Sequence, residues 1–199
     1  MILMKALCEV EERDALILDL LTQLRQDGMF GGIHGAPDEL LLHSGGPESD
    51  LSQRSLLMGP ATRRYLVRQP SIESHSTIGS PLRGEIDLQS NPAPMQIHVE
   101  DWDDGWIHRE IIYGIDLADG LRQLSPHLPL AQGDGFQAGG LAGLLTYDMV
   151  QHTEPLRFQH PPVEDSILMI LYLADRWIVH DRIESTIEIH SSIDNDGWV

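Results

Sequence analysis

The stretch that decides the fold runs from Gly139 to Glu154 and reads GGLAGLLTYDMVQHTE. Its first half is a short apolar run without clean alternation, which predicts a strand buried on both faces over 141–146. Glycine is a poor strand former. Gly139, Gly140 and Gly143 therefore indicate a bulge or a place where another backbone comes close.

A short helix is expected directly after this strand. Asp148, followed three residues later by Gln151, fits a helix N-terminus, where a side-chain oxygen accepts from free backbone N–H groups and a partner reaches back. Pro155 disfavours helical backbone at Glu154, so the helix should end there. The sequence therefore predicts a strand, then a tight connection, then one or two helical turns that end at Glu154.

The same stretch resembles the N-terminal region of component I of anthranilate synthase and of aminodeoxychorismate synthase. The matching residues are Gly139, Gly140, Gly143, Tyr147, Asp148, Val150 and Glu154. Leu144 stands where that family commonly has an aromatic residue, and Gln151 stands near its usual arginine. The resemblance runs from about residue 14 to about residue 190, loosely in the middle third. A plain core strand with packing glycines is the alternative interpretation.

Composition narrows the class of protein. The chain has 199 residues, which suits one domain of respectable size or one and a half. Its formal net charge of −18 argues against nucleic acid and anionic membrane surfaces as partners. Lys5 is the only lysine among 13 lysines and arginines. This shortage of lysine together with the large excess of carboxylates fits adaptation to high salt, and it equally fits a generally acidic, soluble protein.

Cysteine content and hydropathy bear on the compartment. Cys8 is the only cysteine and cannot form an internal disulfide, which fits a reducing cytosol. No apolar run approaches the length of a membrane span, and the short apolar start 1–7 is too short for a signal peptide. The expected location is the cytoplasm.

Periodicity predicts two longer helices. Residues 11–26 place four leucines on one helical face, with Gly28 as the stop, and residues 116–127 place three more on another. Strands are expected at 39–44, 55–58, 61–68, 71–78, 95–99, 107–113, 167–173, 177–180 and 185–190.

These elements predict an α+β fold with packed antiparallel sheets flanked by helices. Strands 61–68 and 71–78 should form a hairpin, and Asp104-Gly105 should turn another. The resemblance implies a two-sheet sandwich with a small-molecule pocket between the sheets.

The resemblance also implies a candidate amino-acid pocket. Leu42, His43 and Ser44 fall on the last three positions of a Leu-Leu-Glu-Ser motif, whose serine belongs to an allosteric tryptophan pocket in the anthranilate enzymes. Arg54 and Ser55 keep part of an Arg-Tyr-Ser motif. His43 replaces a glutamate, and neutral imidazole cannot pair by charge with an ammonium group. Binding of L-tryptophan is therefore an open question, and His43 and Ser44 could instead satisfy turn backbone groups.

No catalytic residue is assigned in this chain. In the resembled enzymes a separate chorismate-binding half supplies the acid and base groups and the carboxylates that hold magnesium, and none of its motifs occurs here. No paired cysteine or His-Glu-x-x-His spacing predicts a metal site. The whole chain is thus interpreted as the N-terminal domain of a chorismate-aminating synthase.

The resemblance gives this domain two expected partners, the chorismate-binding half and a glutamine amidotransferase subunit. The branch is folate or tryptophan biosynthesis, with His43-Ser44-Gly45 leaning towards aminodeoxychorismate synthase. The alternative is a free-standing, non-catalytic domain that binds an aromatic amino acid or a protein partner.

Overall fold

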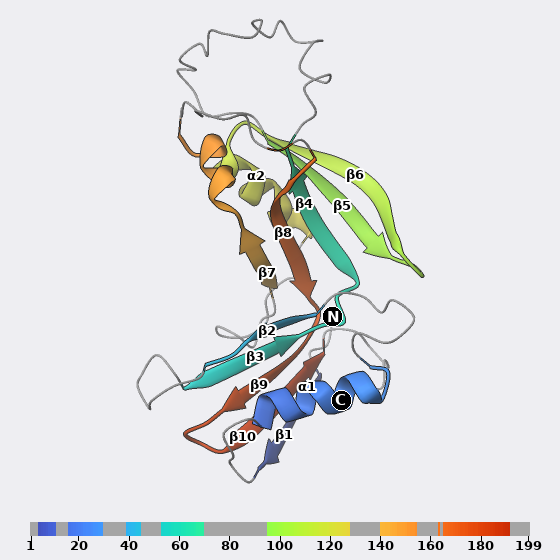
Figure 1. Ribbon diagram of the computed structural model, residues 1–199, viewed down its shortest axis with the longest axis vertical. Coiled ribbons are helices and arrows are strands. Elements are labelled where there is room, and N and C mark those ends of the chain that lie inside the picture. Colours follow the sequence, from blue (N-terminus) through green and yellow to red (C-terminus); the bar gives the residue numbers. More distant parts are fainter. Residues whose placement is uncertain are drawn as a thin grey trace, which may run out of the picture.

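The computed structural model describes residues 4–10, 16–29, 39–44, 53–69, 95–127, 140–154, 163 and 165–191. Within these residues, the strands form two antiparallel sheets of five strands each. Figure 1 shows the sheets one above the other along the long axis of the molecule, with a helix on each. The predicted α+β fold, an antiparallel two-sheet sandwich flanked by helices, is confirmed.

The first sheet joins the two ends of the described chain. Its strands, in spatial order, are β1 (Met4–Glu9), β10 (Thr186–Ser191), β9 (Arg176–Asp181), β3 (Arg54–Met58) and β2 (Leu40–Leu42). Every neighbouring pair is antiparallel. This order leaves β1 and β2 at the two edges.

The second sheet is built from the middle of the chain. Its strands, in spatial order, are β6 (Trp106–Gly114), β5 (Met95–Trp102), β4 (Arg63–Arg68), β8 (Ile167–Ala174) and β7 (Gly140–Leu145). All four pairings are antiparallel. The β5–β6 hairpin turns at Asp104 and Gly105, both at positive φ, as predicted.

The chain passes between the sheets twice, from β3 to β4 and from β8 to β9. At this corner the Gly59 amide donates to the Arg176 carbonyl oxygen at 3.1 Å. The Thr62 hydroxyl donates to the Asp175 carboxylate. These hydrogen bonds join the two crossings to each other.

Helix α1 (Leu16–Gln26) covers the outer face of the first sheet. Its end is a Schellman motif, in which the Met29 amide donates to the Leu24 carbonyl oxygen at 2.9 Å and Gly28 has a φ of 75°. The predicted stop at Gly28 is therefore confirmed. The part of the predicted helix at 11–15 lies outside the described residues.

Helix α2 (Leu117–Leu124) lies against the second sheet. Asp116 caps it, because its side chain accepts from the Asp119 amide at 2.7 Å. A 3₁₀ turn, η2 (Ser125–His127), completes the predicted helical span.

Three apolar clusters hold these layers together. The first joins α1 to the first sheet through Leu16, Ile17, Leu21, Leu57, Ile178 and Ile187. The second joins α2 to the second sheet, with Leu124 and Met149 over Tyr65, Val67, Met95, Ile97, Val99, Met169 and Leu171. The third lies between the sheets and contains Met58, Ala174, Trp177 and Val179, with Leu40, Leu56 and Ala142 packed against it.

Two predictions for the stretch 139–154 are wrong. Strand β7 is an edge strand rather than one buried on both faces, and Leu144 and Leu145 are 52% and 48% exposed. The helix that follows is the 3₁₀ helix η4 (Tyr147–His152), and its N-cap is Thr146 rather than Asp148. The Gln151 side chain donates to the Asp148 carbonyl oxygen and to Gln69, so it does not cap the helix start.

The strand β1 and the partners of β4 also differ from what the sequence predicts. Strand β1 was not predicted, because the run Met4–Glu9 lacks alternation and gains its place only by pairing with β10. The second strand of the expected 61–68/71–78 hairpin lies outside the described residues. Within them, β4 pairs with β5 on one side and β8 on the other.

Candidate functional site

The end of β2 is tied to β3 by one buried hydroxyl. The register pairs Leu42 with Leu56, so the residues after Leu42 lie beside Ser55 and Arg54. The Ser44 amide donates to Ser55 Oγ at 3.0 Å, and His43 Nδ1 lies 3.3 Å from the same oxygen. Ser55 is fully buried. The side chain of Ser55 thereby fixes the backbone at Ser44 and the ring of His43.

Arg54 is held by an acid from the other end of the chain. Its Nε donates to Asp181 Oδ2 at 2.8 Å, and Asp181 Oδ1 accepts from the amides of Ile183 and Glu184 at 3.1 Å each. Burial raises the pKa of Asp181, but these hydrogen bonds outweigh burial and hold that pKa below its ordinary value. The guanidinium of Arg54 is therefore engaged by a carboxylate in this structure.

The β9–β10 turn closes the same corner of the sheet. The Arg182 amide donates to the Gln53 carbonyl oxygen at 2.9 Å, and Arg182 Nη1 donates to the Ser44 carbonyl oxygen at 3.3 Å. Residues from two distant parts of the chain thus form a single hydrogen-bonded rim at the end of β2.

The four predicted pocket residues are neighbours, but their side chains divide between two faces. His43 reaches Ser55, whose strand neighbour Leu57 packs under α1. Leu42 pairs with Leu56, which packs in the cluster between the sheets, and Leu42 is 49% exposed. Strand alternation explains this division, since successive side chains point to opposite faces. Leu42, His43, Ser44 and Arg54 therefore lie together along this rim.

The glycine motif lies in the second sheet, on β7. A Cβ added at Gly143 would lie 1.9 Å from the Ile170 carbonyl oxygen, so β8 leaves no room for a side chain there. Gly140 begins the strand at a φ of 155°, and Gly139 lies outside the described residues. Ala142, between the two glycines, packs in the cluster between the sheets with Leu40 and Leu56. The glycine strand and the start of β2 therefore share one core.

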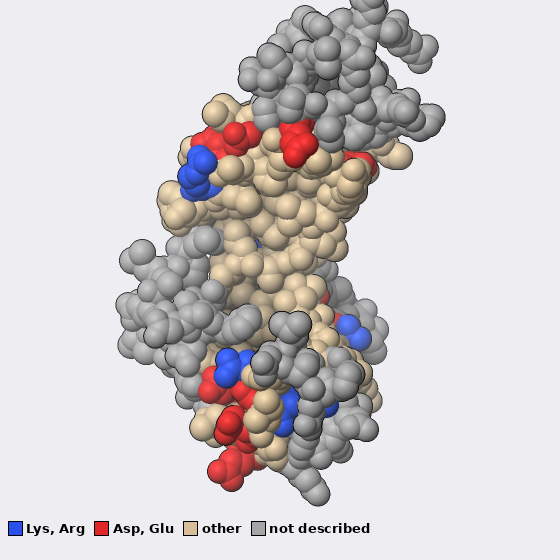
Figure 2. All heavy atoms as spheres, turned by 90° about the vertical axis from the view of Figure 1, so that its left-hand side faces the viewer, with Lys and Arg blue, Asp and Glu red and all other residues tan. Residues whose placement is uncertain are grey.

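Tyr147 and Asp148 complete the motif at the start of η4. Tyr147 is 85% exposed, and Asp148 is half-buried in the first turn of the helix. Leu144 and Leu145 are also exposed, and as consecutive strand residues they point to opposite faces of the sheet. We call these two leucines and Tyr147 the β7 strip. Figure 2 shows the side of the molecule that carries β7 and η4, and its middle section is largely free of charged side chains among the described residues.

Sequence reasoning missed a buried aromatic pair in the first sheet. The rings of Trp177 and His190 stack at 5.0 Å with an interplanar angle of 5°. His190 Nε2 lies 3.1 Å from Glu188 Oε2, and the imidazole is fully buried. The alternation of Thr186, Glu188 and His190 along β10 was the available signal that one face carries polar groups.

The described residues contain no group of three or more His, Cys, Asp or Glu side chains that could hold a metal ion. Within the same part of the chain, no helix has the length and apolar character needed to cross a membrane. Comparison with models of known protein families gives no match, and no curated protein sequence matches the chain.

Proposed function

We propose that this chain is the N-terminal, non-catalytic half of a cytoplasmic synthase that aminates chorismate. In the complete enzyme the other half would bind chorismate and magnesium, and a glutamine amidotransferase subunit would supply ammonia. The role of this half is structural and regulatory: it presents the Leu42–Ser44 rim and a contact surface for the other half.

The observation that carries the proposal is the hydrogen bonding of Ser55. Two separate motifs contribute to the resemblance, Leu-Leu-His-Ser ending at Ser44 and Arg-Ser at 54–55. They lie on adjacent strands, and Ser55 Oγ contacts both the Ser44 amide and the His43 ring. The β2–β3 pairing brings the two motifs side by side, and the buried Ser55 hydroxyl is a hydrogen-bonding group that both of them use. This shared hydrogen bonding supports the interpretation of the Leu42–Ser44 rim as a candidate amino-acid site.

The β7 strip supports the proposed contact with the other half. An edge strand with exposed leucines is a liability for an isolated protein, because it offers unpaired backbone groups and apolar side chains to other chains. The middle of the side that carries β7 is also largely uncharged among the described residues in Figure 2, although the chain has a net charge of −18. Both properties fit a surface that another domain covers.

His43 favours the folate branch over the tryptophan branch. A carboxylate at this position would pair with the ammonium group of an amino acid, whereas the imidazole beside Ser55 supplies no negative charge for such a pair. The proposal therefore places the chain in aminodeoxychorismate synthesis first and in anthranilate synthesis second.

The second candidate function is a free-standing binding domain. The three apolar clusters favour this second function, because both sheets bury a core within the described residues. A domain with its own core can fold without a partner. Sequencing the transcript beyond Val199 separates the two functions. A reading frame that continues into a chorismate-binding domain supports the proposal, and a stop codon with no such domain encoded beside it supports the binding domain.

A further inference from the structure

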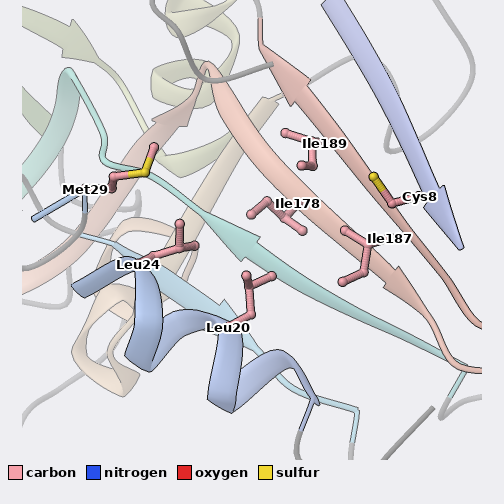
Figure 3. Close-up of a pocket in the computed structure, with 7 residues that line it drawn as sticks. All are labelled: Cys8, Leu20, Leu24, Met29, Ile178, Ile187 and Ile189. Carbon is pink, nitrogen blue, oxygen red and sulfur yellow. The ribbon is translucent and has the colours of Figure 1, made fainter. Parts of the chain in front are cut away.

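A groove of about 190 Å³ lies between α1 and the first sheet, and none of its lining residues belongs to the Leu42–Ser44 rim. Figure 3 shows its walls: leucines of α1 point towards isoleucines of β9 and β10, with Met29 and Cys8 towards opposite ends. The lining residues are Cys8, Leu20, Leu24, Met29, Ile178, Ile187 and Ile189.

The groove follows from the way α1 packs. Leu16, Ile17 and Leu21 are buried against the sheet, whereas Leu20 and Leu24 are only partly buried. The Schellman motif then turns the chain at Gly28, and the Met29–Leu24 hydrogen bond places two groove-lining residues together at one end. The helix thus packs tightly along one side and leaves apolar side chains uncovered along the other.

The lining determines the chemistry of a ligand. None of the seven side chains carries a charge, and the thiol of Cys8 is the only hydrogen-bond donor among them, a weak one. The charged groups of a zwitterion would find no charged partner in this lining. A cavity of about 150 Å³ lined by aliphatic side chains is known to bind benzene, so about 190 Å³ suits a one- or two-ring molecule.

We propose that this groove binds a small, uncharged aromatic molecule of about the size of indole, with its edge against the Cys8 thiol. The site is separate from the Leu42–Ser44 rim and does not depend on the proposed function of the chain. It selects against free amino acids, because their charged groups find no partner in the lining.

The chain provides its own reporter, since Cys8 is its only cysteine and is exposed. The experiment measures the rate at which N-ethylmaleimide alkylates the native chain at increasing concentrations of indole, with L-tryptophan as the charged comparison. We expect a saturable decrease with a Kd on the order of 1 mM, so that indole at about twice its Kd slows alkylation about threefold. L-tryptophan should leave the rate unchanged.

A matched pair of variants tests the location. Leu24→Trp fills the groove and should abolish the effect of indole, while Leu18→Trp, on an exposed position of α1 outside the lining, should keep it. Circular dichroism checks that both variants fold. If Leu24→Trp is unfolded, methyl NMR of the native chain decides, since indole should then shift Ile178, Ile187 and Ile189.

Three results would overturn the proposal. One is an alkylation rate that indole does not change. The second is protection that persists in folded Leu24→Trp, and the third is equal protection by L-tryptophan. Each would mean that Cys8 does not report on an apolar site for an uncharged ring.

Discussion

The carbonyl oxygen of Ile170 lies so close to Gly143 that a Cβ on residue 143 would come within 1.9 Å of it. The obstacle is backbone on a paired strand, so no side-chain rotation can relieve it. Only glycine therefore fits at position 143 while β7 stays this close to β8, which gives the glycine of the sequence motif a structural reason.

Replacing Gly143 by alanine should destabilise the chain severely. The methyl group must push β7 away from β8, and we expect a loss of roughly 3 kcal/mol or more in the free energy of unfolding. Urea denaturation measures this loss. Gly140→Ala is the matched control, because a Cβ there meets nothing within 4 Å and only its φ of 155° is unfavourable. That variant should lose about 1 kcal/mol, and equal losses in the two variants would contradict this explanation.

Asp101 should make the stability of the second sheet depend on pH. Its carboxylate accepts from Arg63 Nε at 2.6 Å, from Arg63 Nη2 at 3.1 Å and from Arg109 Nε at 3.0 Å. The Arg63 hydrogen bond is the largest cause that lowers the pKa of Asp101, and it outweighs the effect of burial. A pKa lowered by folding contributes stability above the unfolded-state pKa of about 4, and this is lost as pH falls through the folded-state pKa.

Asp101→Asn should therefore cost about 1 to 2 kcal/mol at pH 7, and the difference from the native chain should shrink as the pH falls below about 4. Thermal unfolding followed across this range measures both effects. Asp103→Asn, in the exposed turn of the same hairpin, is the control and should cost less than about 0.5 kcal/mol. A constant difference between Asp101→Asn and the native chain at all pH values would show that the ion pairs contribute nothing.

His43→Glu should improve binding of L-tryptophan. The position lies on the rim beside Ser55, and a carboxylate there can pair with the ammonium group of the ligand. We expect isothermal titration at pH 7.5 to show at least about fivefold tighter binding than the native chain, a gain of about 1 kcal/mol. His43→Gln keeps a polar side chain without the charge and should not gain affinity. No gain in His43→Glu would remove the rim from the candidate amino-acid sites.

Local features of the fold were predictable from sequence, because they depend on neighbours along the chain. The leucines of 16–24 specify one helical face, Gly28 ends that helix, and Asp104-Gly105 turns the β5–β6 hairpin. The backbone approach at Gly143 was also foreseen from the general behaviour of glycine in strands.

Features that depend on distant residues were not predictable. Arg54 matched a motif, but its carboxylate partner Asp181 lies 127 positions away. The apolar run at 141–146 gave no sign that β7 would be an edge, because hydrophobicity does not say what covers a strand. Asp148 satisfied a capping pattern, yet the N-cap lies two residues earlier, at Thr146, whose hydroxyl donates to the Leu168 carbonyl oxygen on β8. Tertiary pairing decided each of these cases.

The most direct test of the proposed function is a chimaeric enzyme. This chain replaces the N-terminal half of an anthranilate synthase component I, and the purified chimaera is assayed for anthranilate formed from chorismate with ammonium and Mg²⁺. The account predicts more anthranilate than the chorismate-binding half forms alone, and loss of that gain with Gly143→Ala. A folded chimaera no more active than the chorismate-binding half alone would contradict the account.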